Sequence, residues 1–75
     1  MNKVRRKEIA RAIELMEQAR EILETVRDEE QEAFDNMPEG LQCSERGEAM
    51  EEYIGTLEEA IDSLETDALQ EIVDG

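Results

Sequence analysis

Apolar residues recur at helical spacing in two segments of the chain, one on each side of Pro38. The first segment has one row of residues spaced by seven and a second row three positions later. The first row is Ile9, Met16, Leu23, Glu30 and Met37, and the second row is Ala12, Ala19, Val26 and Ala33. These heptad rows predict a helix over about residues 4–36 that packs closely against another helix. Residues 1–7 are basic, and we expect them to fray.

The second segment has the more regular pattern. Its apolar residues alternate between steps of four and three: Met50, Ile54, Leu57, Ile61, Leu64 and Ala68. This spacing is that of a coiled-coil seam, and Ser44 is placed to cap the helix that carries it. Gly47 extends the seam, although glycine within a helix costs about 1 kcal/mol relative to alanine. We therefore expect a neighbouring backbone to pass close to Gly47.

The end of the chain can be interpreted in two ways. Thr66 and Asp67 could cap a separate short helix that contains Leu69, Ile72 and Val73. Alternatively, the second helix continues to about residue 73, and this is the interpretation that we favour. In both cases these apolar residues widen the apolar surface.

The stretch Asn36–Gly40 predicts a reversal between the two helices. Proline cannot continue a helix, and it pushes the preceding residue toward extended geometry. Gly40 could supply a positive φ for a tight turn, and we expect Leu41 to fold back over the end of the hairpin. The chain is thus predicted to be all-α: one domain over residues 1–75, forming an antiparallel two-helix hairpin with its turn at residues 37–43.

A hairpin of 75 residues can bury only a thin core, and small scaffolds usually need a staple or a partner. The single cysteine, Cys43, cannot form an internal disulfide. We expect the second seam to pack against Ile9, Met16, Leu23 and Val26 within the hairpin. Other apolar residues, among them Ile13, Leu15 and Ile22, would remain for another chain. A homodimer, most simply a four-helix bundle, is therefore predicted.

Charge is divided unevenly along the chain, whose net charge is −14. Residues 1–27 carry seven basic and five acidic residues, whereas residues 28–75 carry only Arg46 against seventeen acids. An antiparallel hairpin would place the basic start beside the acidic end. Ion pairs between them are expected to favour that register. The basic residues are Lys3, Arg5, Arg6, Lys7 and Arg11, and the acids are Glu65, Asp67, Glu71 and Asp74.

Several kinds of chemistry are disfavoured by the composition. Histidine is absent, which removes the commonest metal ligand and general base. A loop resembling a calcium site begins at Asp35, but its third and twelfth places are Met37 and Arg46 instead of oxygen ligands. Paired carboxylates need a pocket that separates their pKa values, and a two-helix unit offers none. We expect no enzymatic activity, no cofactor and no metal.

Composition also bears on partners and location. One Tyr, one Phe and no Trp leave no aromatic platform for bases, and the negative charge should repel nucleic acid and anionic membranes. No apolar run approaches the roughly 20 residues of a membrane span. The basic start lacks the apolar core of a signal peptide. These features, together with the free thiol, favour the cytoplasm.

The region from Arg27 to Leu64 contains sequence motifs that are more specific than a plain helical hairpin requires. The run Arg27–Gln42 contains an aromatic-Asp-Asn-x-Pro-Glu turn, and a Ser-Glu-Arg-Gly cap begins at Ser44. Together with the later stretch Leu57–Ile61, this sequence resembles a helical-hairpin segment of small acidic proteins from bacteriophages and mobile elements. The resemblance covers about half of the chain. The resemblance implies the hairpin fold and a bacterial or phage setting, in the cytoplasm of a bacterial host cell. It implies no activity and no catalytic residues.

Two functions remain. The first is an acidic interaction module that binds a basic surface of a protein partner, such as a nucleic-acid-handling or defence protein, as an inhibitor or decoy. Contacts at the turn through Phe34, Pro38 and Arg46 would supplement its acidic face. The alternative is a structural dimerising hairpin within a phage or host assembly, with the acids serving only solubility. The acidic face consists of Glu48, Glu51, Glu52, Glu58, Glu59, Asp62 and Glu65.

Overall fold

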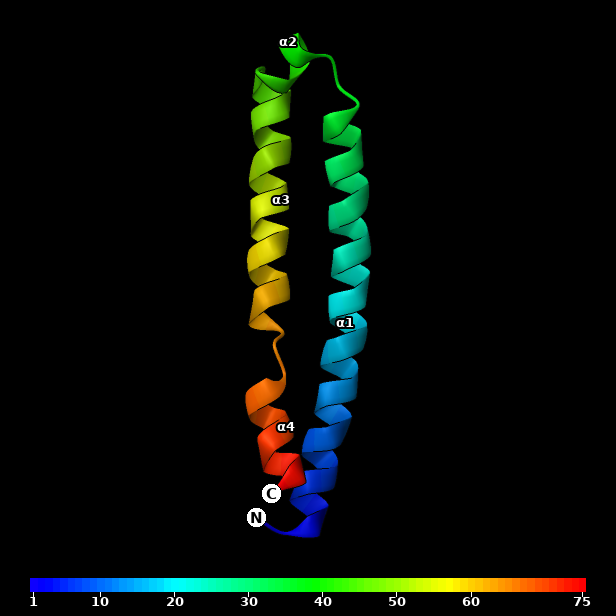
Figure 1. The fold of residues 1–75 in the computed structure, drawn as a ribbon, viewed down its shortest axis with the longest axis vertical. Helices are drawn as coiled ribbons and strands as arrows, with labels where there is room; N and C mark the ends of the chain where they lie inside the picture. Colours follow the sequence, from blue (N-terminus) through cyan, green and yellow to red (C-terminus); the bar gives the residue numbers. More distant parts are fainter.

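The protein is an elongated antiparallel helical hairpin (Figure 1), described for all residues 1–75 by a computed structural model. One long helix runs the length of the molecule, and three shorter helices return along it. The bounds are Lys3–Asp35 for α1, Glu39–Gln42 for α2, Glu45–Ser63 for α3 and Asp67–Asp74 for α4. The Cα extents are 58 × 14 × 13 Å and the radius of gyration is 17.4 Å, whereas a compact domain of this length has about 11 Å. The predicted helical hairpin is confirmed.

The basic start of the chain, which we expected to fray, is helical from Lys3 onward. Asn2 is the N-cap of α1, and its Oδ1 accepts a hydrogen bond from the Arg5 N–H at 2.8 Å. This bond satisfies one of the free N–H groups at the helix start. The capped helix carries the basic residues as a regular extension of α1.

The reversal does not use a glycine with positive φ, as the sequence suggested, because no glycine in the chain has one. Pro38 is extended, with φ −56° and ψ 145°, and stops α1 from continuing. The chain then makes the single turn of α2, where the Leu41 and Gln42 N–H groups both donate to the Pro38 carbonyl. Leu41 remains 52% exposed, so the prediction that it folds over the hairpin end is wrong.

The seam of α1 has one row that was predicted and one that was not. Ile9, Met16, Leu23 and Met37 are half-buried, as predicted, and Glu30 in the same row is half-buried too, although a glutamate there suggests a solvated stretch. The second row is Ile13, Arg20, Arg27 and Phe34, each four residues after a member of the first row, instead of Ala12, Ala19, Val26 and Ala33. With this row facing α3, the Ile13 side chain is only 4% exposed. Burying Ile13 stabilises the hairpin more than burying the smaller Ala12 would. Arginine stems can cover apolar surface while their charged ends reach water.

The seam of α3 is confirmed from Gly47 to Leu64. Ile54 and Ile61 are buried, and Met50, Leu57 and Leu64 are half-buried. The Ser44 hydroxyl caps the helix by accepting from the Gly47 N–H at 3.4 Å. A Cβ on Gly47 would lie 2.1 Å from the Gln42 carbonyl oxygen. The expected close approach to Gly47 is therefore confirmed, and the backbone concerned is that of α2.

The second helix does not continue to residue 73. It ends at Ser63, and α4 begins at Asp67. The Leu64 and Glu65 N–H groups donate three residues back, to the Ile61 and Asp62 carbonyls, so the last turn tightens and ends. The Thr66 side chain makes no cap bond; the Glu65 carboxylate accepts from the Asp67 N–H instead. The interruption leaves Ala68 exposed and turns Leu69 and Val73 toward α1.

The core between the helices is thin. Its buried apolar side chains are Ile13, Ile54 and Ile61, and no large side chain is fully buried. Ion pairs do not add to the contact between the two arms, because both ion pairs in the molecule lie within α1. The predicted pairing of the basic start with the acidic end is therefore wrong. Packing along the seam holds the arms together.

Candidate interaction surface

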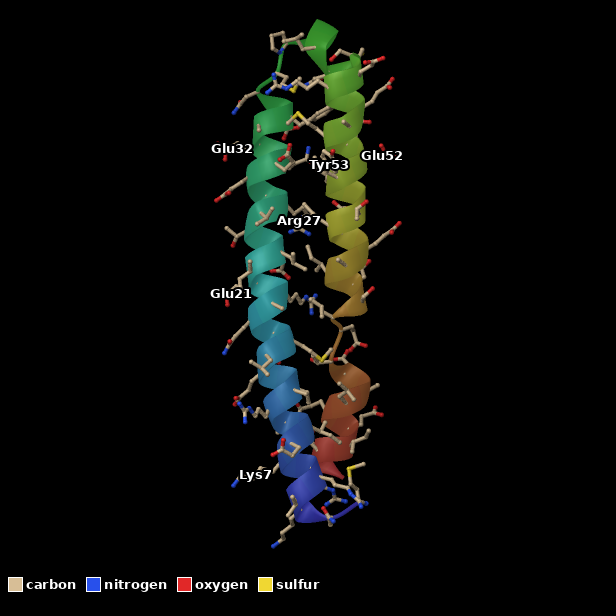
Figure 2. The ribbon with its side chains drawn as sticks, turned by 180° about the vertical axis from the view of Figure 1, so that it is seen from behind. Lys7, Glu21, Arg27, Glu32, Glu52 and Tyr53 are labelled. Carbon is tan, nitrogen blue, oxygen red and sulfur yellow. The ribbon has the colours of Figure 1, made fainter.

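The predicted acidic residues of α3 are all exposed, and most of them occupy one type of position. Glu48, Glu51, Glu58 and Asp62 each come directly after a seam residue of α3, and Glu65 follows the seam residue Leu64. The other two, Glu52 and Glu59, lie one position further around the helix. Figure 2 shows Glu52 projecting from the side of α3 that faces away from α1. The acids thus cover one side of α3 and its outer edge.

The long helix adds acids to the same side of the hairpin. On each helix, residues directly after seam positions project to one side, and residues directly before them project to the other. Because the helices are antiparallel, the two "after" sides coincide. We call this combined surface the acidic side. Its α1 members are Glu14, Glu17, Glu21, Glu24, Asp28 and Asp35, and its later members are Glu48, Glu51, Glu58, Asp62 and Glu65.

Sequence reasoning missed the α1 half of this surface. The reason is the second seam row, since placing Ala12 and Val26 in the seam assigns the wrong residues to its flanks. The correct row could be recognised from the sequence because an acid directly follows each of its residues: Ile13, Arg20, Arg27 and Phe34. Figure 2 shows Glu21 and Glu32 projecting from the outer side of α1. The negative surface therefore extends around that edge as well.

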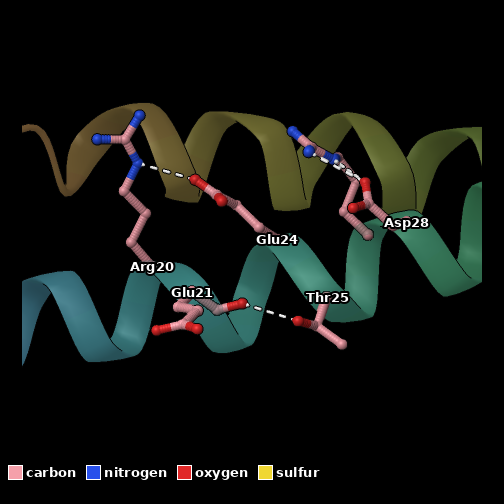
Figure 3. A network of polar contacts seen from close by, with 6 residues as sticks. Arg20, Glu21, Glu24, Thr25 and Asp28 are labelled. Carbon is pink, nitrogen blue, oxygen red and sulfur yellow. Dashed lines mark hydrogen bonds and ion pairs between the residues drawn. The ribbon is translucent and has the colours of Figure 1, made fainter.

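Two seam arginines neutralise part of the α1 half (Figure 3). The Arg20 Nε lies 3.1 Å from the Glu24 Oε1, and the Arg27 Nη2 lies 3.0 Å from the Asp28 Oδ1. Glu24 follows Arg20 by one helical turn, so the first pair also supports the helix locally. The acids of α3 have no such partners, and residues 47–75 contain no basic residue. Uncompensated negative charge is therefore concentrated on α3.

The predicted site residue Glu65 has a structural role, because its carboxylate is engaged in a hydrogen bond. The Glu65 side chain accepts a hydrogen bond from the Asp67 N–H at the start of α4. This bond takes the place of the missing Thr66 cap. Glu65 is exposed, but reversing its charge would disturb the joint between α3 and α4. The other acids of α3 are better suited to a test of binding.

The three turn residues differ in their availability. Phe34 is half-buried in the seam, and its carbonyl accepts a hydrogen bond from the Gln42 Nε2 at 3.0 Å. It therefore closes the hairpin. Pro38 and Arg46 are exposed. Arg46 does not adjoin the acidic side, because it comes directly before the seam residue Gly47 and so lies on the opposite side.

No other part of the molecule has the geometry of a small-molecule or metal site. A surface depression of about 400 Å³ is lined by five residues of α1 between Lys7 and Glu14, so a single helix forms its wall. Cys43 is exposed and free. Nowhere do three or more His, Cys, Asp or Glu residues come together as possible metal ligands. No helix has both the length and the apolar composition needed to cross a bilayer.

Comparison with known proteins finds no matching family model, no matching curated protein and no matching solved structure. The resemblance of Arg27–Leu64 to small acidic proteins of bacteriophages and mobile elements stays a prediction.

Proposed function

We propose that the chain is a non-enzymatic interaction module whose acidic side binds a basic surface on a protein partner, such as a nucleic-acid-handling or defence protein. The supporting observation is that the α3 acids from Glu48 to Asp62 are exposed and none of them has an ion-pair partner. Holding like charges together without compensation destabilises the folded state. A basic partner would relieve that repulsion when it binds.

The charge density suits a partner that normally accepts nucleic acid. Residues 47–75 carry ten acids, which at about 1.5 Å per helical residue corresponds to roughly one charge every 4 Å. A single nucleic-acid strand has about one charge every 3.4 Å. The molecule that carries these acids is elongated, with a longest Cα extent of 58 Å. A basic channel or groove could therefore accept this side as an inhibitor or decoy.

The test reverses four carboxylates that lie outside the core. Replacing Glu51, Glu52, Glu58 and Glu59 with Lys should leave the helical content native and remove binding to the basic partner. A matched control replaces Glu8, Glu32, Glu39 and Glu71, which are also exposed, and gives the same change in net charge. Pulldown from bacterial lysate, quantified by mass spectrometry, compares the two variants with the wild-type chain at low and high salt.

The proposal predicts which proteins are captured and how their binding depends on salt. Proteins captured by the wild type and the control, but not by the α3 variant, should dissociate as salt screens the contact. If the folded α3 variant captures the same proteins as the wild type, the acidic side is not the binding surface. The turn residues Pro38 and Arg46 would then be the next candidates.

A second candidate function is a structural hairpin that dimerises into a four-helix bundle within a larger assembly. It is favoured by a different observation, the large apolar side chains that remain outside the core. Leu15 is 55% exposed and Ile22 is 63% exposed, as the sequence predicted, whereas Ile13 belongs to the hairpin core. The acidic side does not contribute to this function, so both functions can belong to one molecule.

A further inference from the structure

The side of the hairpin opposite the acidic side is almost free of charge. It is formed by the residues directly before the seam positions of both helices, and we call it the uncharged side. Its α1 members are Ala12, Leu15, Ala19, Ile22, Val26 and Ala33, and its α3 members are Ala49, Tyr53, Thr56, Ala60 and Ser63. Between Ala12 and Ser63, the exceptions at such positions are one acid, Glu29, and one base, Arg46.

Large apolar side chains on this side are open to water. Val26 is 43% exposed and Tyr53 is 64% exposed, in addition to Leu15 and Ile22. Figure 2 shows Tyr53 at the edge of α3 that borders α1. Large exposed apolar side chains gathered on one side of a small protein often mark a contact site. The alternation of small and large side chains on this side suits helix packing.

We propose that a second copy of this chain covers the uncharged side, so that two hairpins stack face to face as a four-helix bundle. This proposal specifies the surface for the second candidate function, and it does not depend on the acidic side having a partner. Charge favours a second copy over a basic protein as the partner that covers the uncharged side. A basic protein would be drawn to the acidic side, whereas a second copy has an equally uncharged surface to offer. Stacking through it directs both acidic sides outward, which limits repulsion between two chains of charge −14.

Shape and area are consistent with a second copy. Helix over residues 12–33 spans about 32 Å, and the hairpin is 14 Å across its Cα atoms. The projected area is on the order of 450 Å², and protruding Leu, Ile and Tyr side chains raise the accessible area above that. A standard interface buries about 800 Å² per partner, so we expect a small and reversible dimer interface. Two identical faces also match in length, as an isologous dimer requires.

Two adjacent residues provide a matched test. Val26 lies on the uncharged side, whereas Thr25 is exposed on the outer side of α1. Sedimentation equilibrium from about 1 to 500 µM should show a dimer for the wild type and for Thr25→Glu. Val26→Glu should weaken the association about 100-fold or more, because a carboxylate without a partner would be buried. Circular dichroism establishes that each variant is helical.

Tyr53 gives a second readout that needs no variant. It is the only tyrosine, and tryptophan is absent, so it is the natural fluorophore of the protein. Quenching of its fluorescence by acrylamide should fall over the concentration range in which the mass doubles. The proposal is overturned if the wild type remains monomeric at the highest concentration, if Val26→Glu and Thr25→Glu associate equally, or if quenching does not change with association. Loss of lysate partners from the α3 variant would be unaffected by any of these results.

Discussion

Arg20 and Arg27 stand at seam positions that helical hairpins usually give to apolar residues. Their side chains remain partly exposed, at 43% and 30%, because the long stem packs while the guanidinium reaches the acidic side. There each guanidinium pairs with a carboxylate of its own helix. Polar residues in a seam reduce stability but help to specify one register. The arginines thus connect the packing of the hairpin to its surface charge.

Gly47 allows a prediction with an internal control. A Cβ at Gly47 would overlap the Gln42 backbone, whereas a Cβ at Gly55 on the same helix meets nothing within 4 Å. Gly55→Ala should therefore stabilise the protein by up to about 1 kcal/mol through helix propensity. Gly47→Ala should destabilise it by about 1–3 kcal/mol, since α2 must move. Urea unfolding followed by circular dichroism measures both, and equal stabilisation by the two changes would refute the close contact.

The sequence allowed the hairpin to be predicted because its strongest signals are local. The Met50–Leu64 spacing, the Ser44 cap and Pro38 each act through a few neighbouring residues. The side of α1 that faces inward was harder to predict, because Ala12 and Ile13 are both compatible with helix. Only the identity of the opposing surface decides between them. Arg20 and Arg27 do not fit a purely apolar seam pattern, so such a pattern does not identify the row to which they belong. The acids that directly follow this row, which form much of the α1 half of the acidic side, are then not identified either.

Helix α4 is the least supported element of the return arm. It has eight residues and no side-chain bond from its N-cap Thr66, and none of its residues is buried. Isolated helices of this length are unstable in water. The docking of Leu69 and Val73 against α1 must therefore maintain it. That docking keeps the C-terminal acids close to the basic start of α1 without any ion pair.

Hydrogen exchange should distinguish α4 from α3. We expect the amides of α4 to exchange at least about tenfold faster than those at the centre of α3, around Ile54, because α4 can open without unfolding the hairpin. Residue-resolved exchange by NMR makes the comparison, and the solvent-exposed start of α1 serves as the reference for fraying. Equal protection in α3 and α4 would show that the return arm unfolds as one unit despite its interruption.

At the scale of the whole molecule, the hairpin has two unlike sides: one acidic and one almost uncharged. This division follows from a tendency shared by both helices: most residues directly after seam positions are acids, and most residues directly before them are small or apolar. The antiparallel arrangement places the two acidic halves together. The molecule has a net charge of −14 and only two ion pairs. Repulsion within the folded state is therefore expected mainly among the acids of residues 28–75, which carry all of the excess negative charge.

Salt should consequently stabilise the protein. Raising sodium chloride from low to moderate concentration screens repulsion between exposed acids, and we expect the melting temperature to rise by several degrees, about 4–8 °C for each 1 kcal/mol gained. The variant with Lys at residues 51, 52, 58 and 59 has a smaller net charge, so its melting temperature should rise less. Thermal unfolding by circular dichroism at several salt concentrations tests both expectations. A melting temperature that falls with salt would instead indicate that attraction between the basic start and the acidic end holds the arms together.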